Sequence, residues 1–407
     1  MIEIILGTII FTGLVMVLAL IVLGARIMIW GRGQVRLTVN DERVIETTHG
    51  EKLLGVLSQA GVNLPTSCGG AGTCGLCRVK VSGKGSADAS PVERAQMNAK
   101  DIADGYRLAC QFVVRGNLNV SVPKDLLGAE TWSCTVRQTR TLSPLIKEIA
   151  LALPEGAERS FAAGCYVLVN APQFTLEFSD IDVAPAHDET WQALGLRRLK
   201  VESHLEQTRA YSLVNRPDVH DALIVNIRLA LPPGDNPDAP PGVVSSYLFG
   251  LQIDDIVSVS GPYGDFFIQD TDREIVLVGG GVGMAPLYAH AYDQLEHRHT
   301  RRAIHYWYGA RSRQDLYYAD EMEALARQHD NFSWTPVLSE PAPEDDWQGE
   351  TGFVHQSVER NFLKSHPAPQ DCEYYLCGPP LMIRAVRALL DEHGVPPEHI
   401  FSDDFGA

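Results

Sequence analysis

The chain has 407 residues, of which 45% are hydrophobic and 21% are charged, and its formal net charge at pH 7 is −17. This length allows two or three globular domains, each with its own core. The acidic balance and the lack of any Lys or Arg run exclude nucleic acid as an expected partner. The eight Cys are too few and too unevenly spaced for the disulfide scaffold of a secreted protein.

The first segment, from Ile4 to Leu23, contains no charged residue. A helix of about 20 apolar residues matches the hydrocarbon core of a bilayer, so this run predicts a transmembrane helix within an anchor of residues 1–30. A cleaved signal peptide fits poorly, because no basic segment precedes the run and no small-x-small cleavage site follows it. A buried core helix is the other alternative.

Basic residues follow this apolar run: Arg26, Arg32 and Arg36 lie after it, and Glu3 is the only charged residue before it. The positive-inside rule then places the rest of the chain in the cytoplasm, with one crossing of the membrane. The cytoplasm is reducing, so free or metal-bound thiols are expected rather than disulfides.

Residues 34–126 read as a small β-rich domain with one or two helices. The strand-like pieces are "VRLTVN", "RVIETT", "CRVKVSG" and "NLNVSVP", and "EKLLGVLSQAG" reads as a helix. Between them lies the stretch "SCGGAGTCGLC", which holds the cysteines of a C-x5-C-x2-C pattern, and a fourth cysteine follows in "RLACQ": Cys68, Cys74, Cys77 and Cys110.

Four thiolates, three on one loop and one distant, are the ligand set of a 2Fe–2S cluster. The glycines of the loop allow unusual backbone angles and a close approach to the inorganic sulfides: Gly69, Gly70, Gly72 and Gly75. Zinc is the competing ligand, but zinc sites usually combine two C-x2-4-C pairs, and here the fourth cysteine stands alone. The segment resembles β-grasp ferredoxins, and its five-residue spacing is similar to that of the vertebrate-type ferredoxins.

Residues 130–270 contain several short strands at close spacing, which favours a barrel or sandwich. "RAYSLVN" in this region resembles the flavin signature of ferredoxin–NADP+ reductase-like enzymes. The resemblance implies that Arg209 pairs with the FAD phosphate, Tyr211 stacks on the flavin ring, and Ser212 hydrogen-bonds near N5. A helix start in "PGVVSSYLFG" offers amides suited to the pyrophosphate, at Gly242, Val243 and Ser245. We expect an antiparallel β-barrel that binds FAD.

Residues 271–407 alternate strands with helices, which predicts an α/β domain with a parallel sheet. In "EIVLVGGGVGMAPL" an apolar strand runs into glycines and then a helix, the context of a phosphate-binding loop. This loop resembles the nicotinamide loop of the same reductase family, which implies NADH binding at Gly279, Gly280, Gly281 and Gly283.

Two further elements of the reductase family are present near the end of the chain. "YLCGPPLM" matches its C-G-P motif, which implies that Cys377, Gly378 and Pro379 lie beside the nicotinamide ring. The aromatic residue in "SDDFGA" resembles the terminal aromatic that shields the flavin, which implies that role for Phe405. The resemblance thus points to Cys377, Ser212 and Phe405 as catalytic residues. The alternatives are that Cys377 is a buried structural cysteine and that Phe405 only packs on the last strand.

The order of modules (membrane helix, 2Fe–2S domain, FAD domain, NAD domain) resembles the family of electron-input subunits of the Na+-translocating NADH:quinone oxidoreductases. The resemblance implies a place in a bacterial inner-membrane complex, with hydride passing from NADH to FAD and single electrons passing through the cluster to partner membrane subunits. Quinone is then reached through those partners. Two alternatives stay open: the reductase component of a membrane-bound oxygenase, and a membrane redox sensor without turnover.

Overall fold

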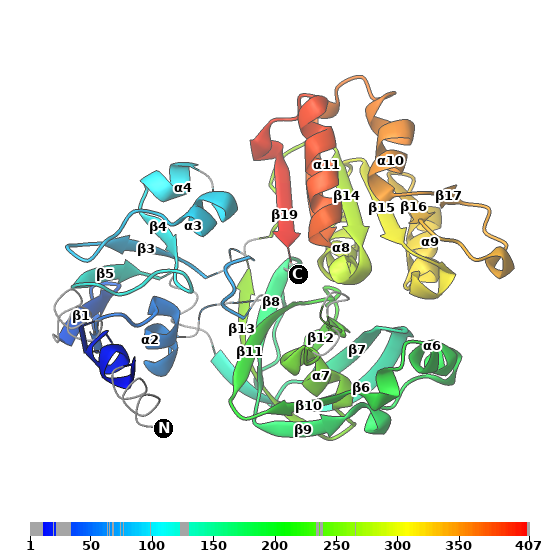
Figure 1. Cartoon of the computed structure of the whole chain (residues 1–407). Coiled ribbons are helices and arrows are strands. Elements are labelled where there is room, and N and C mark those ends of the chain that lie inside the picture. The colour runs from blue at the N-terminus through cyan, green and yellow to red at the C-terminus, as the bar shows by residue number, and fades with distance from the viewer. Residues whose placement is uncertain are drawn as a thin grey trace. The chain divides into compact units, whose positions relative to one another are not determined.

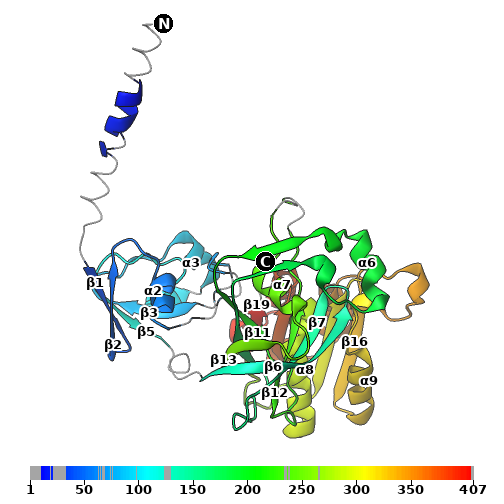
Figure 2. The same ribbon diagram turned by 90° about the horizontal axis from the view of Figure 1, so that it is seen from below.

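The computed structural model places the chain in two compact units, Met1–Leu64 with Gly70–Leu127 and Pro65–Gly69 with Gly128–Ala407 (Figures 1 and 2). The residues it describes are 11–18, 20–21, 34–62, 64, 66, 69–73, 75, 77–97, 99–122, 130–232, 236, 239–264 and 266–404. Residues 11–18, 20 and 21 are helical, and their large apolar side chains are exposed. Within these described stretches, no helix has both the length and the hydropathy needed to cross a bilayer. The remaining residues of the predicted anchor lie outside the described ones.

The first unit is built on a five-stranded sheet with the strand order β2-β1-β5-β3-β4. Only β1 and β5 pair in parallel, and the other pairs are antiparallel. The strands are β1 (Gln34–Val39), β2 (Arg43–Thr48), β3 (Arg78–Ser82), β4 (Tyr106–Leu108) and β5 (Leu118–Ser121), and the helices are α2 (Leu53–Gln59), α3 (Pro91–Gln96) and α4 (Ala99–Ala103). β1 buries every second side chain, so one face of the sheet and α2 enclose a single core.

The second unit begins with a six-stranded antiparallel sheet with the order β11-β8-β13-β6-β7-β12. Its strands are β6 (Glu130–Ser143), β7 (Ile146–Ala152), β8 (Cys165–Ala171), β11 (Gln207–Ser212), β12 (Ala222–Arg228) and β13 (Ile256–Gly264). A bridge between Leu213 and Val225 joins the two edge strands, and the Val214 N–H donates to the Ile224 carbonyl at 2.8 Å. The sheet therefore closes on itself, and α7 (Val243–Gly250) packs apolar side chains into its core.

The segment that interrupts the barrel strands has structure of its own. It contains the hairpin strands β9 (Phe174–Glu177) and β10 (Lys200–Ser203), with α6 (Asp188–Ala193) between them. Trp191 of α6 is fully buried in the barrel core, and its indole N–H donates to the Pro144 carbonyl at 2.6 Å. The insertion therefore completes the core of the barrel as well as covering it.

The rest of the second unit is a six-stranded parallel sheet with the order β17-β16-β15-β14-β18-β19. Its strands are β14 (Ile275–Gly280), β15 (Ile304–Ala310), β16 (Phe332–Leu338), β17 (Glu350–Thr351), β18 (Glu373–Gly378) and β19 (Ile400–Asp404). Alternate residues of β14 enter two different cores, one shared with α8 (Met284–Tyr292) and α9 (Ala319–Gln328), the other with α10 (Val354–Val358) and α11 (Pro380–Glu392). Helices thus cover both faces (Figure 1).

The strand order reverses at β14. From β14 the chain adds β15, β16 and β17 on one side, and then returns to place β18 and β19 on the other. In open parallel sheets, ligands bind in the crevice at the carboxyl ends of the strands where the order reverses. The topology therefore points to the ends of β14 and β18 as a binding site.

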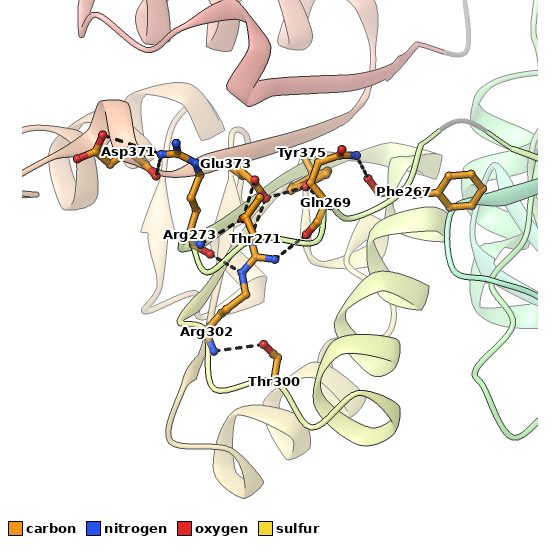
Figure 3. Close-up of polar contacts among 9 residues, drawn as sticks. All are labelled: Phe267, Gln269, Thr271, Arg273, Thr300, Arg302, Asp371, Glu373 and Tyr375. Atoms are coloured by element: carbon orange, nitrogen blue, oxygen red, sulfur yellow. Dashed lines mark hydrogen bonds and ion pairs between the residues drawn. The ribbon is translucent and has the colours of Figure 1, made fainter.

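The segment that connects the barrel to the parallel sheet is held by a buried ion pair (Figure 3). Arg302 Nη2 lies 2.7 Å from Glu373 Oε2, and the two side chains are only 9% and 3% exposed. Arg302 also donates from Nη1 to the Gln269 carbonyl at 2.9 Å and from Nε to the Arg273 carbonyl. Arg302, which stands just before β15, thus holds both ends of the connecting segment.

Glu373 is satisfied by further donors in the same network (Figure 3). Thr271 Oγ1 donates to its Oε1 at 2.8 Å, and the Tyr375 hydroxyl donates to its Oε2 at 2.9 Å. The Gln269 N–H in turn donates to the Tyr375 hydroxyl at 2.8 Å. The carboxylate therefore holds the connecting segment, β15 and β18 together.

We expect Glu373→Gln to lower the free energy of unfolding of the second unit by about 3 kcal/mol, because it leaves the buried Arg302 guanidinium without its charge partner. The matched control is Asp221→Asn, which removes an exposed ion pair with Arg137 at 2.9 Å; it should cost about 1 kcal/mol or less. Urea unfolding followed by far-UV circular dichroism measures both. Equal losses in the two variants would contradict this account of the network.

Candidate functional site

The first of three candidate regions is the cysteine loop, whose residues from Gly70 onward belong to the first unit. Cys77 and Cys110 are both buried in its core, and the Ala109 N–H donates to the Cys77 carbonyl at 2.9 Å. This bond brings the two predicted ligands together although they are distant in sequence. Cys68 and Cys74 lie outside the described residues.

The loop around these cysteines has the backbone that the sequence predicted. Gly69, Gly70, Gly72 and Gly75 have φ angles of +64°, +90°, +86° and +69°, in the region that side chains disfavour. Gln111 Nε2 donates to the Gly70 carbonyl at 3.2 Å and to Cys110 Sγ at 3.5 Å. A donor aimed at a cysteine sulfur suits a ligating thiolate, so the described part of the loop fits a 2Fe–2S cluster.

The second part is strand β11 of the barrel. Arg209 and Tyr211 pair with Val169 and Val167 of β8, which places both on one side of the strand. Tyr211 is half-buried against the barrel core, and burial raises the pKa of its hydroxyl, so it is a neutral aromatic platform. Arg209 Nη1 donates to the Thr208 carbonyl at 2.8 Å, so the guanidinium lies along its own strand. These residues suit a flavin and its phosphate.

Ser212 ends β11 and meets the last strand of the parallel sheet. Its Oγ donates to Asp403 Oδ2 of β19 at 3.1 Å. Asp403 pairs in register with Cys377 of β18, which pairs with Gly279 of β14. One row of residues thus crosses the sheet, from the predicted nicotinamide loop to the predicted flavin strand.

The start of α7 has a local function that the sequence did not reveal. Gly242 caps the helix, and a Cβ there would lie 2.6 Å from the Ala230 Cβ and 2.8 Å from Ser245 Oγ. Ser245 Oγ donates to the Gly242 carbonyl at 3.0 Å and accepts the Ala230 N–H at 3.2 Å. Ser245 therefore fixes the turn before α7, and Val243 begins the helix whose amides were predicted to face the pyrophosphate.

The third part is the glycine loop after β14. Gly279 and Gly280 end the strand, Gly281–Gly283 form a 3-10 turn, and α8 follows at once. A Cβ on Gly283 would lie 2.0 Å from the Cys377 carbonyl oxygen, so only glycine permits this contact between loop and β18. The Gly281 carbonyl accepts hydroxyl hydrogen bonds from Tyr308 at 2.8 Å and Tyr317 at 3.0 Å, which fix the loop.

The C-G-P motif lies directly beside this loop. Cys377 is fully buried, and Gly378 has a φ of +149° with its Cα so close to the Gly280 carbonyl that a Cβ would lie 2.7 Å from that oxygen. Pro379 caps α11. The two glycine-containing segments therefore pack backbone to backbone at the reversal point of the sheet.

A pocket of about 540 Å³ opens at these strand ends. Its walls include Gly280, Gly281 and Pro379 from the predicted loops, together with Arg228 and Arg311. Glycine amides and arginine side chains are suited to bind the phosphates of a dinucleotide, and the volume of this pocket is in the range of cofactor sites. The pocket therefore fits NADH, with its lining drawn from both the barrel and the parallel sheet.

Several residues of the site were outside the sequence prediction. Asp403, Arg228, Tyr308 and Tyr317 carry no motif, although Asp403 stands beside the predicted terminal aromatic in "SDDFGA". Asp403, Arg228 and Tyr308 are placed by strand register and Tyr317 by the loop before α9, and one sequence provides neither. Phe405, the predicted flavin shield, lies outside the described residues.

Comparison with known families divides the chain into the same modules. The description "2Fe-2S iron-sulfur cluster binding domain" matches residues 37–115, "Oxidoreductase FAD-binding domain" matches residues 195–268, and "Oxidoreductase NAD-binding domain" matches residues 277–388. The chain therefore combines an iron–sulfur domain, an antiparallel FAD domain and a parallel α/β NAD domain.

Solved structures share this fold. The cytochrome P450 reductase GcoB of Amycolatopsis is 26% identical, with a TM-score of 0.61 over 91% of this chain and 98% of that one. The ferredoxin reductase in carbazole 1,9a-dioxygenase is 22% identical, with a TM-score of 0.57 over 92% of this chain and 98% of that one. The second likeness concerns the fold alone.

Whole-chain relatives are more similar. The F subunit of the Na(+)-translocating NADH-quinone reductase of Neisseria gonorrhoeae is 42% identical, and the match covers 99% of this chain and 100% of that protein. The proteins of the same name in Mannheimia succiniciproducens and Pasteurella multocida are also 42% identical, over 97% and 99% of this chain and 97% and 100% of theirs. The chain belongs to the family of the F subunits of the Na+-translocating NADH-quinone reductases.

Proposed function

We propose that this chain is the NADH-oxidising subunit of a Na+-translocating NADH:quinone reductase, in which hydride passes from NADH to FAD and single electrons pass on through a 2Fe–2S cluster. The observation that carries the proposal is the row from Gly279 through Cys377 and Asp403 to Ser212. It joins the nicotinamide loop to the flavin strand within one unit. The full-length likeness to the F-subunit family supports the same function.

Binding of NADH rests on the strand-end pocket. Gly280 and Gly281 present backbone to the pocket where a side chain would block it, and Arg228 and Arg311 supply positive charge. Arg311 Nη2 also lies 2.8 Å from Glu340 Oε2, in an exposed ion pair at the rim of the pocket. The half of the dinucleotide that carries the hydride would then lie toward Cys377.

The flavin is proposed to lie against β11, with Tyr211 as its stacking platform, Arg209 at the phosphate, and the α7 start (Gly242, Val243, Ser245) near the pyrophosphate. When bound, FAD supplies the conversion of a two-electron hydride into single-electron transfer. The Ser212 hydroxyl donates a hydrogen bond to Asp403, so the lone pairs of the Ser212 oxygen stay available to accept a hydrogen bond. Phe405 is proposed to cover the other flavin face.

Cys68, Cys74, Cys77 and Cys110 are proposed as the ligands of the iron–sulfur cluster. The cluster supplies a one-electron acceptor. Gln111 places an N–H on the Cys110 sulfur, and such donors stabilise thiolate charge. All four loop glycines have positive φ angles, and a Cβ at Gly72 would lie 2.7 Å from Gln111 Nε2, the donor to the Cys110 sulfur.

The proposed domains are an anchor (1–30), a β-grasp ferredoxin domain (34–126), an FAD barrel (130–270) and an NADH domain (271–407). The apolar run from Ile4 to Leu23 supports a single-pass anchor in the bacterial inner membrane, with the other domains in the cytoplasm. Membrane subunits of the same complex are the proposed electron acceptors, and quinone is reached through them.

The first test concerns Asp403, a positioning residue. Asp403→Asn should slow flavin reduction at saturating NADH about tenfold, because the hydrogen bond from Ser212 to a charged acceptor is worth about 1.5 kcal/mol or more. FAD content and KM should stay unchanged. Anaerobic stopped-flow absorbance measures the rate, and Ser402→Ala, at an exposed position on the same strand, is the control.

The double variant with Ser212→Ala distinguishes positioning from general damage. If the two residues act through one contact, the double variant should be little slower than either single variant. Fully multiplicative effects, or an unchanged rate in Asp403→Asn, would contradict the proposed role of the contact.

The second test separates flavin from cluster. Cys110→Ala should remove the visible iron–sulfur absorbance while FAD stays bound and is still bleached by NADH, because the cysteine lies in the first unit and the flavin site in the second. Cys134→Ala, at a buried cysteine of the barrel, is the control and should keep the cluster. Iron and inorganic sulfide retained in Cys110→Ala would refute the ligand assignment.

The third test concerns the anchor. A chain without residues 1–30 should leave the membrane fraction and still oxidise NADH with an artificial acceptor, because every proposed cofactor residue lies after the deletion. Quinone reduction by the assembled complex should be lost. A truncated chain that neither folds nor binds FAD would show that the first helix belongs to the core.

A further inference from the structure

The amino ends of the parallel strands carry a cluster of side chains that the proposed redox function does not use. Glu274 directly precedes β14, His305 is the second residue of β15, and Cys372 directly precedes β18. His366 joins them from the turn before β18. The NADH pocket lies at the opposite, carboxyl ends of these strands, so this cluster is separate from it.

The donor atoms of the cluster are close together. A Glu274 carboxylate oxygen, a His366 ring nitrogen and Cys372 Sγ all lie within 4.8 Å of one another. His366 Nε2 and His305 Nε2 each lie 3.4 Å from Glu274 Oε2. Tetrahedral zinc with bonds of about 2.0–2.3 Å keeps its ligand atoms about 3.3–3.8 Å apart. The donor atoms of Glu274, His366 and Cys372 are close to this spacing, and His305 Nε2 approaches the same Glu274 oxygen.

The two imidazoles are held in place by their surroundings. The Phe362 ring contacts both, with ring centres 5.0 Å from His305 and 4.7 Å from His366, and it stacks on His366 at 26°. His305 Nδ1 lies 2.9 Å from Ser333 Oγ, which can accept a hydrogen bond from the Nδ1–H group. A metal-binding histidine typically donates its second ring N–H in this way, so His305 is prepared to offer Nε2 as a ligand.

We propose that Glu274, His305, His366 and Cys372 form a binding site for a zinc ion. Mixed imidazole, thiolate and carboxylate donors suit zinc, whereas calcium and magnesium prefer oxygen ligands alone. One carboxylate and one thiolate balance the charge of Zn²⁺, which leaves the filled site neutral. Glu274 is partly exposed and gives the ion access from solvent, and Cys372 closes the site from the core.

Two protons must move when the ion binds. Cysteine binds zinc as its thiolate, so the ion displaces the proton of the Cys372 thiol. His366 Nδ1 accepts the Ala368 N–H at 3.2 Å, so His366 Nε2 carries the ring proton before binding. Coordination through Nε2 requires that proton on Nδ1, and the contact with Ala368 is then given up.

The experiment uses the full-length, untagged chain with FAD and cluster bound, dialysed against buffered Zn²⁺, with bound zinc and iron counted by mass spectrometry. We expect one zinc per chain beyond any background. Glu274→Gln and Cys372→Ser should each weaken its binding at least about tenfold, since each removes an anionic ligand. The matched controls are Glu340→Gln, an exposed carboxylate, and Cys134→Ser, a buried cysteine of the barrel; both should bind zinc like the unaltered chain.

Proton release provides a second readout. Zinc added in weak buffer should release the Cys372 proton from the unaltered chain, and Cys372→Ser should release about one proton fewer. If Cys372→Ser fails to fold, Glu274→Gln decides alone, because its side chain is partly exposed. The absence of saturable zinc binding, or equal binding by Glu274→Gln and the unaltered chain, would overturn the proposal. Neither result bears on NADH oxidation, so the proposed function stands or falls separately.

Discussion

The close approach of Gly283 to the Cys377 carbonyl is the constraint on which the geometry of the second unit depends. A Cβ at Gly283 would lie 2.0 Å from that oxygen, so any other residue would push α8 away from β18. This contact brings the glycine loop and the C-G-P motif to the same point of the sheet. The register of β18 with β19 places Asp403 beside Cys377, and Asp403 accepts a hydrogen bond from Ser212 of the barrel.

The carboxyl ends and the amino ends of the parallel strands, called here the carboxyl edge and the amino edge of the sheet, carry different side chains. Glycines, arginines and the row ending at Ser212 gather at the carboxyl edge, where backbone must approach a ligand. The amino edge holds the buried pair of Arg302 and Glu373, and beside it the proposed zinc ligands. Glu373 and Cys377 stand at opposite ends of one strand, β18, so the pair that fixes the connecting segment also fixes the strand that carries the C-G-P motif.

Local patterns were enough to predict the features that depend on backbone chemistry. The glycines of the cysteine loop adopt the positive φ angles expected of them, and the strand–glycine–helix pattern of the nicotinamide loop is present as predicted. The family resemblance drawn from these motifs is confirmed by the full-length relatives. These features were predictable because a positive φ angle is a local property of the backbone and the order of strand, glycines and helix is read directly from the sequence. Features that depend on distant pairing were not predictable from one sequence. Asp403 meets Ser212 only because β19 is the last strand of one sheet and β11 an edge of another.

Two further residues show the same limit. Ser245 was predicted to offer its backbone amide at a helix start, and its hydroxyl has a structural role that the motif did not indicate, in hydrogen bonds with the Gly242 carbonyl and the Ala230 N–H. Trp191 lies in the segment that interrupts the barrel strands, and burial of its large apolar side chain draws that segment into the barrel core. In both cases a contact comes from a segment outside the local pattern: Ala230 for Ser245, and the barrel core for Trp191.

The central claim is that hydride from NADH is transferred to the flavin bound at β11, and that single electrons reach the 2Fe–2S cluster only afterwards. Anaerobic stopped-flow mixing of the purified holoprotein with NADH deuterated at the transferred position tests it most directly. The account predicts that flavin absorbance falls first, with a primary isotope effect, and that cluster absorbance follows without an isotope effect of its own. Cluster reduction that precedes flavin reduction, or that persists in protein stripped of FAD, would contradict it.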